Sequence, residues 1–270
     1  MERIESGPSQ DPGGDSVPES SRRIMDLVLA AGQILLENGA EVFRVEQTMC
    51  IMANSFSLQD FHVYVLTNGI FASAHDGQIS EVRNVPNHTV HLARVDAVNT
   101  LSRRIAAGGV TLEEAEAQLK KAGEIPPPTA WGQRMACSLG VFCFAVMFGG
   151  TLKDGFIAAI SGFILASYLL WCGKRHVHSI FQKMTGAALV SVSCLIGGIL
   201  LNGNVDSATI GALMILTPGM AFTMGIRDFA NSDYLSGSIR MIDALLVGGS
   251  IAGGAGLIMA LYNHWVGGLL

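Results

Sequence analysis

Three residues, Thr217, Pro218 and Gly219, interrupt a long apolar segment near its middle. Proline removes a backbone hydrogen bond from a helix, and glycine tolerates unusual backbone angles, so the sequence favours either a kink or a complete break here. A break would expose the amino-terminal amides of the second half-helix, which attract anions such as carboxylates. A simple kink, which is common in membrane helices, is the alternative without a binding role.

Three charged residues near that interruption are candidates for contact with a substrate: Arg227, Asp228 and Asp243. A guanidinium beside the break would help to recruit a carboxylate, and an acid about one turn into the last apolar segment could carry a coupling proton. Structural roles compete with both ideas. Arg227 and Asp228 also fit an interfacial anchor or ion pair, and Asp243 also fits a helix-end charge that still reaches water.

Other kinds of chemistry have no support in the sequence. Residues 22–125 contain no Gly-x-Ser-x-Gly elbow and no phosphate-binding glycine loop, so we expect no catalysis, no cofactor and no ATP-driven transport. Two histidine pairs, His88 with His91 and His176 with His178, lack a third ligand, and the five cysteines form no Cys-x-x-Cys motif. Metal sites and disulfides are therefore not expected, and the net charge of −5 argues against a nucleic-acid partner.

The composition indicates that the second half of the chain is embedded in a lipid bilayer. Of the 270 residues, 14% are charged, whereas soluble domains average about 25%. Residues 132–270 hold only 7 Lys and Arg and 5 Asp and Glu. Five nearly uncharged stretches approach the ~20 residues that a membrane-spanning helix needs, which predicts an all-α bundle of five transmembrane helices. These stretches cover residues 132–150, 155–173, 184–202, 207–226 and 241–262.

The charges between these stretches predict the orientation in the membrane. Eight Lys and Arg fall on the side of the first half of the chain, and one falls on the other side. The positive-inside rule therefore places the first half in the cytoplasm and the carboxyl terminus outside. Because five is an odd number, a second copy of such a unit would insert upside down, as in inverted-repeat transporters. The eight are Lys120, Lys121, Arg134, Lys174, Arg175, Lys183, Arg227 and Arg240, and the one is Lys153.

Small residues in the last stretch predict a helix-packing face. The glycines Gly248, Gly249, Gly253 and Gly256 recur at helical spacing. Small residues let a second helix approach closely in a membrane, so packing is a better explanation of this face than ligand contact.

The first half of the chain reads as a cytoplasmic α+β domain over residues 22–125. Residues 1–21 are polar and rich in Gly, Pro and Ser, which predicts a disordered tail. Helices are expected over 22–38, 41–56 and 88–107, with a fourth after Thr111, and strands over 61–66, 70–75 and 79–85. Residues 126–131 begin with three prolines and predict a stiff linker.

Several of these segments together resemble the threonine/serine exporter family. The resemblance rests on ENGAEVFRVEQTM at residues 37–49, TNGI at 67–70, TPGMA at 217–221, IRD at 226–228, Asp233, and Ser236 with Gly237. It extends in matching order over about residues 22–262. One departure is Ser232, where the family usually has glycine before the aspartate.

The resemblance implies an exporter of small hydrophilic metabolites in the bacterial cytoplasmic (inner) membrane. The family has a long form, in which this unit is fused to a second hydrophobic half, and a split form, in which that half is a separate small membrane protein. The chain resembles the larger subunit of the split form, for which export of a dicarboxylate such as succinate has been proposed. The implied partners are that small subunit, a carboxylate or amino-acid substrate, and the lipid bilayer.

The resemblance also suggests a role for three residues of the cytoplasmic domain. Glu41, Arg44 and Glu46 lie in the shared motif and would dock against the cytoplasmic mouth of the pathway. A solvated salt-bridge face on one helix explains the same spacing without such a role. Two further functions remain open at this point, a membrane-anchored enzyme and a membrane-bound sensor with a cytoplasmic domain.

Overall fold

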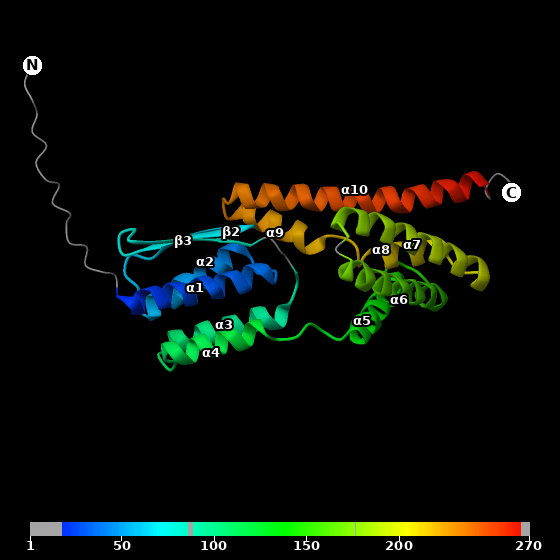
Figure 1. Cartoon of the computed structure of the whole chain (residues 1–270). Helices are drawn as coiled ribbons and strands as arrows, with labels where there is room; N and C mark the ends of the chain where they lie inside the picture. Colours follow the sequence, from blue (N-terminus) through cyan, green and yellow to red (C-terminus); the bar gives the residue numbers. More distant parts are fainter. Residues whose placement is uncertain (1–17, 86–88, 176, 266–270) are drawn as a thin grey trace, which may run out of the picture. The chain divides into compact units, whose positions relative to one another are not determined.

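The computed structural model describes residues 18–85, 89–175 and 177–265. The chain divides into two compact units at the bond between Ile125 and Pro126 (Figure 1). Residues 1–17 of the tail predicted over 1–21, together with His88 and His176, lie outside the described residues, whereas residues 19–21 belong to the first helix.

The first unit combines four helices with one small antiparallel sheet. The helices are α1 (Glu19–Glu37), α2 (Val42–Ser55), α3 (Leu92–Ala106) and α4 (Leu112–Gly123). The strands are β1 (His62–Leu66), β2 (Gly69–Ala74) and β3 (Ile79–Asn84), and they pair in the order β1-β2-β3. Each helix and strand predicted for this half has a counterpart. The capping box predicted at Thr111 is present, with Glu114 as its partner.

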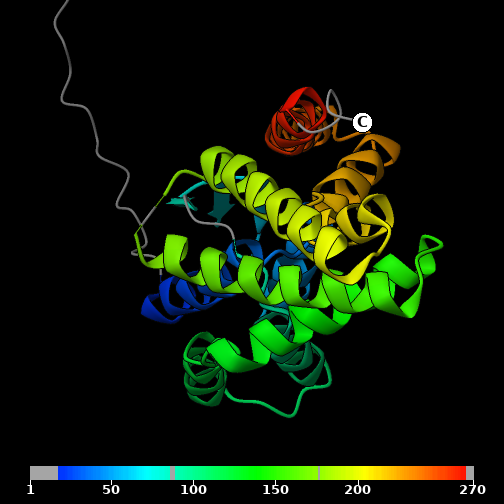
Figure 2. The same cartoon turned by 90° about the vertical axis from the view of Figure 1, so that its right-hand side faces the viewer.

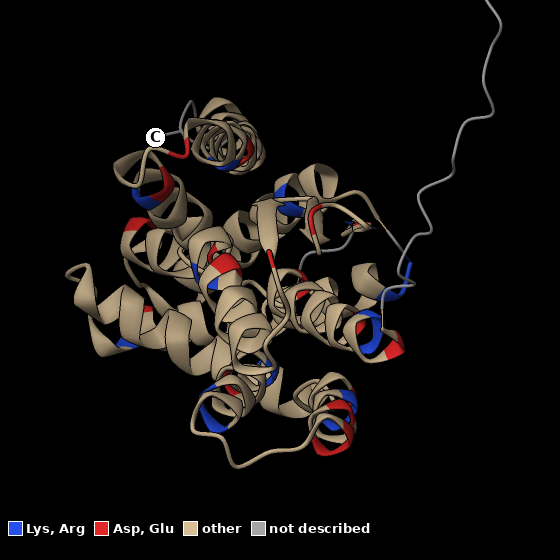
Figure 3. Cartoon of the chain, turned by 90° about the vertical axis from the view of Figure 1, so that its left-hand side faces the viewer, with Lys and Arg blue, Asp and Glu red and all other residues tan. Residues whose placement is uncertain are grey.

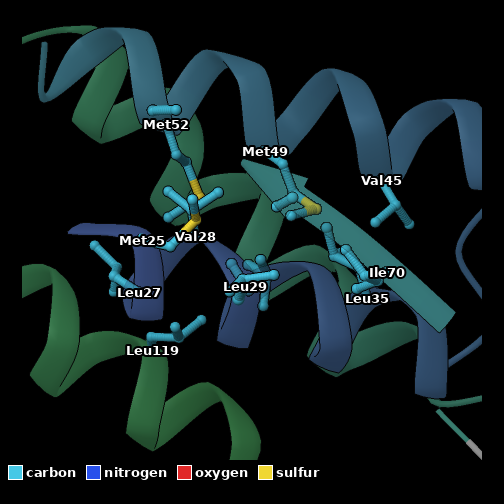
Figure 4. Packing of buried hydrophobic residues seen from close by; sticks show 14 of the residues in the cluster. Met25, Leu27, Val28, Leu29, Leu35, Val45, Met49, Met52, Ile70 and Leu119 are labelled. Atoms are coloured by element: carbon cyan, nitrogen blue, oxygen red, sulfur yellow. The ribbon is translucent and has the colours of Figure 1, made fainter. Parts of the chain in front are cut away.

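The core of the first unit lies between α1, α2 and the sheet. Met25 of α1 lies beside Met52 of α2, Leu35 of α1 lies beside Ile70 of β2, and all four side chains are fully buried (Figure 4). Leu119 brings α4 onto the same cluster. Burial of each such side chain contributes roughly 1.5–3 kcal/mol, so this unit has a hydrophobic core of its own.

The family-like segment at residues 37–41 forms the turn between α1 and α2. Gly39 has φ +89°, a left-handed conformation that favours glycine. The backbone N–H of Thr89 donates to the carbonyl of Glu37 at 2.7 Å, and the N–H of His91 donates to the carbonyl of Asn38 at 3.2 Å. This part of the motif therefore holds the turn against the segment that enters α3.

The described part of the second unit, residues 126–175 and 177–265, contains six helices. They are α5 (Ala130–Met147), α6 (Leu152–Lys174), α7 (Ser179–Leu201), α8 (Val205–Leu213), α9 (Gly219–Ala230) and α10 (Tyr234–Trp265). Among the described residues, three of them, α6, α7 and α10, are long and apolar enough to cross a membrane. These three correspond to the second, third and fifth predicted spans. The ribbon of this unit carries few charged residues (Figure 3).

The first and fourth predicted spans differ from that pattern. The first corresponds to α5, which has 18 residues and carries the polar Gln133 and Arg134 in its first two turns, so its mean hydropathy is lower. The fourth is two short helices, α8 and α9, separated at Pro218. The structure therefore has a complete break where the sequence allowed either a kink or a break.

The two short helices pack against different neighbours. α8 lies among α5, α6 and α7, where a side chain at Gly211 would collide with Ala145 (Figure 2). α9 packs on α10, and together they form a helical hairpin that extends beyond the start of α7 (Figure 1). Further along α10, Gly254 lies against Met184 and Ala187 of α7. The break thus separates a half-helix inside the bundle from one in the hairpin.

Candidate functional site

The helix break is closed on its α8 side by a side-chain hydrogen bond. α8 ends at Leu213, and the hydroxyl of Thr217 donates to the carbonyl of Leu213 at 3.3 Å. The N–H of Gly219 donates to the carbonyl of Thr217 at 2.9 Å, which folds the chain tightly around Pro218. The residues predicted to open the helix are thus the ones that form the turn.

The α9 side of the break presents unpaired backbone donors. α9 begins after Pro218, which provides no side-chain cap. The N–H of Phe222 donates to the carbonyl of Pro218 at 3.0 Å, whereas no acceptor among the described residues lies opposite the N–H groups of Met220 and Ala221. Free amides at a helix start carry partial positive charge, and this is the arrangement that binds a carboxylate.

Consecutive charged residues near the end of α9 lie in different environments. Arg227 is exposed, whereas Asp228 is buried. A carboxylate oxygen of Asp228 lies 3.1 Å from Nε of Arg240 on α10, and the two side chains are only 6% and 17% exposed. Sequence analysis used Arg240 only to infer the orientation and did not predict this ion pair. No local pattern in the sequence predicts a contact between side chains on two different helices.

The ion pair is accompanied by a close approach of two helix backbones. A side chain at Gly237 would meet the Phe229 ring at 2.8 Å and the Gly225 carbonyl at 3.1 Å. Gly237 belongs to the family-like residues. The geometry gives it a packing role, because it lets α9 and α10 come close enough for Asp228 to reach Arg240.

The turn between α9 and α10 places Ser232, the departure from the family pattern, in a backbone conformation that suits glycine. Ser232 has φ +65°, the left-handed region that favours glycine. The following Asp233 accepts a hydrogen bond from the Ser236 N–H at 3.2 Å and so caps α10. The serine keeps the turn at some conformational cost.

We therefore expect Ser232→Gly to stabilise the chain by about 0.5–1 kcal/mol, since the relief of left-handed strain exceeds the extra entropy of glycine in the unfolded chain. Thermal unfolding of the purified chain in detergent measures the change. Ser238→Gly is the matched control, because Ser238 is exposed inside α10 and glycine weakens a helix interior. If Ser232→Gly and Ser238→Gly destabilise the chain equally, the proposed backbone strain at Ser232 is wrong.

The structure does not bring every predicted pathway residue into one cluster. Asp243 is exposed on α10, one turn beyond Arg240. Gly219 is exposed at the break, and a side chain there would meet nothing within 4 Å. Arg227 and Asp243 are therefore exposed, in contrast to Asp228, which is buried against Arg240.

A buried acid that sequence analysis missed lies at the start of α6. Asp154 is 1% exposed and forms a capping box with Thr151. Its other carboxylate oxygen accepts the backbone N–H of Asn204 at 2.6 Å, which ties α6 to the turn between α7 and α8. The Thr-x-x-Asp spacing before an apolar run is a capping signal that could have identified half of this role.

The small face of α10 is open within this chain. A side chain at Gly248, Gly249, Gly253 or Gly256 would meet no described atom within 4 Å. The neighbouring Gly254, on another side of the helix, is the glycine that packs against α7. The predicted face therefore exists as an unoccupied surface of α10.

The three motif residues of the first unit, Glu41, Arg44 and Glu46, differ in their surroundings. Glu46 accepts the backbone N–H of Val65 at 2.9 Å and so ties α2 to β1. Arg44 is exposed, and Glu41 precedes α2. Burial, together with the Glu46 carboxylate, raises the pKa of the nearby Cys50 thiol, which disfavours the reactive thiolate.

The two described histidines of the predicted pairs, His91 and His178, each lie immediately before a helix. His91 accepts the Arg94 N–H at 3.4 Å and caps α3, and His178 precedes α7. Within residues 18–85, 89–175 and 177–265, no group of three or more His, Cys, Asp or Glu is placed to hold a metal.

Comparison with known proteins gives one consistent result. Residues 26–262 match the family model described as "Putative threonine/serine exporter". The chain is 22% identical over 249 residues to the "Probable threonine/serine exporter" of Mycobacterium tuberculosis (strain ATCC 25618 / H37Rv), covering 89% of this chain and 46% of that protein. It is 23% identical over 250 residues to the "Threonine/serine exporter" of Corynebacterium glutamicum, covering 87% and 50%. The chain thus spans about half the length of these curated relatives. No solved structure matches it.

Proposed function

The chain belongs to the threonine/serine exporter family, and from this premise we propose that it is one half of a cytoplasmic-membrane exporter of small carboxylate metabolites. Its substrate is a dicarboxylate of the succinate type or an amino acid such as threonine or serine, and all of these carry a carboxylate. Because the family is one of exporters, we prefer transport over the membrane-anchored enzyme and the sensor.

The helix break carries this proposal. The free amides of Met220 and Ala221 would bind the substrate carboxylate, as the amino termini of broken helices do in other transporters. The exposed Arg227 would recruit the anion, and the exposed Asp243 would carry a coupling proton. Glu41, Arg44 and Glu46 belong to the cytoplasmic side of the proposed machinery.

We propose five membrane crossings, with α5 as the first and the α8 and α9 segment as the fourth. With these crossings, eight Lys and Arg lie on the same side of the membrane as the first unit and one lies on the other side. By the positive-inside rule, the first unit would then be cytoplasmic. A topology reporter fused after Leu270 should be active outside the cytoplasm, and one fused after Gly123 should be active inside. The reverse pattern would overturn the orientation and the idea of an inverted partner.

The open glycine face of α10 supports a second membrane subunit as the partner. A helix that exposes four small residues in a bilayer offers a close-packing surface to another helix. We expect no export from this chain alone and export on co-expression with a small hydrophobic partner subunit. Accumulation of succinate, threonine and serine outside the cells is the readout.

A substitution on that face tests the contact directly. Gly253→Leu should abolish co-purification of the partner while the chain itself stays folded, since no described atom lies within 4 Å of a Cβ at that position. Cys143→Leu is the control, because it adds bulk at an exposed position of α5. Full export by the chain alone in liposomes as a monomer would contradict the partnership.

A further inference from the structure

A groove on the second unit lies where α6 extends past the start of α5. Its volume is about 470 Å³, and its walls come from α5, α6 and the segment of the helix break. Cys137 and Ala166 form a buried floor, and Leu169, Leu170 and Ile215 form half-buried sides. Gly173 and Lys174 are exposed at one end.

The chemistry of the groove is that of an amphiphile site. The floor and sides are apolar, and none of the described residues that line the groove is acidic. Lys174 supplies a cation at the exposed end, while the Gln133 amide in the wall is already engaged with the Pro128 carbonyl at 2.8 Å. A small hydrophilic metabolite would leave these apolar walls uncovered, whereas a lipid acyl chain would cover them.

The surroundings of Lys174 match a bilayer interface. The guanidinium of Arg175 lies over the Trp171 ring, 5.8 Å from its centroid, and Trp171 is 54% exposed. Tryptophan and basic residues gather at the headgroup layer of membranes, and basic pockets between membrane helices bind acidic headgroups. The charge of this end is therefore complementary to an anionic lipid.

We propose that this groove binds an acidic phospholipid, with its phosphate on Lys174 and an acyl chain along Leu169, Leu170 and Ile215. Ile215 belongs to the segment that separates α8 from α9. A bound lipid would therefore contact the break itself and stabilise its conformation. The inference is independent of the proposed substrate, because it rests on the groove alone.

The test measures lipid binding to the purified full-length chain in neutral detergent. Native mass spectrometry should show at least fivefold tighter binding of dioleoylphosphatidylglycerol than of dioleoylphosphatidylcholine. Lys174→Gln should remove about fivefold of that preference, in line with one basic residue near an acidic headgroup. Lys153→Gln, near the opposite end of α6, is the matched control and should change nothing.

A second variant tests the apolar walls. Gly173→Leu should weaken binding of both lipids, since its new side chain would enter the groove, and a Cβ there meets nothing within 4 Å that would disturb folding. Equal binding of the two lipids, or a phosphatidylglycerol preference untouched by both variants, would overturn the proposal. Competition by glycerol 3-phosphate or succinate at equal concentration would also overturn it, by showing that the groove recognises a soluble anion.

Discussion

Loss of the Asp228 carboxylate is expected to destabilise the chain by about 3–5 kcal/mol, because it leaves Arg240 charged and largely buried without its partner. Asp228→Leu and Arg240→Met should each have this effect. Thermal unfolding of the purified chain in detergent provides the measurement. Asp243→Asn, an exposed acid one turn further along α10, should change stability by no more than about 0.5 kcal/mol.

The double variant separates stability from function. Removal of both charges leaves neither partner as an unpaired buried ion, so the combination of Asp228→Leu with Arg240→Met should recover most of the lost stability. If Asp228 also belongs to the substrate pathway, this stable double variant should export nothing. If Asp228→Leu and Arg240→Met each change the stability as little as Asp243→Asn does, the ion pair contributes little to the stability of the chain.

Closure of the helix break is expected to abolish export. Pro218→Ala restores a backbone donor, and Gly219→Leu replaces the residue with the lowest helix propensity after proline. Together they should join α8 and α9 into one helix and remove the free amides. Membrane insertion should be unchanged, since the segment becomes more apolar. Export normalised to the amount of protein in the membrane is the readout.

The alternative outcome is equally clear. A break without a binding role predicts partial loss at most, with normal apparent affinity for the substrate. Arg227→Gln adds a second arm, because a guanidinium that recruits the carboxylate is worth about 1.5–3 kcal/mol, or tenfold or more in affinity. An interfacial anchor predicts lower abundance at unchanged affinity. Normal affinity in both variants would remove this segment from the site.

Local signals in the sequence predicted local structure. Proline and glycine at 218 and 219 indicated the interruption, and hydrophobic spacing predicted the helices and strands of the first unit. The capping box at Asp154 was not predicted, although the Thr-x-x-Asp spacing at residues 151–154 is a local signal of the same kind. These features depend on a few neighbouring residues, so one sequence is enough to find them.

Contacts between distant segments were not predictable in the same way. The bond from Asp154 to the Asn204 amide joins residues 50 positions apart, and the Asp228 to Arg240 pair crosses a turn. Both depend on how the helices pack, which hydrophobic periodicity does not specify when helices are apolar all round. For the same reason, the different packing partners of α8 and α9 could not be inferred from the break.

The length of α10 sets a condition on the bilayer around it. Its 32 residues span about 48 Å, whereas the hydrocarbon core is about 30 Å thick. Tilt alone would have to reach about 50° to hide it, beyond the 0–40° found for membrane helices. Because Gly254 is the part that packs on α7, the excess falls at the amino-terminal end, next to α9. On this arrangement Asp228 and Arg240 would lie near the edge of the hydrocarbon core, so hydrophobic mismatch would make their environment depend on membrane thickness.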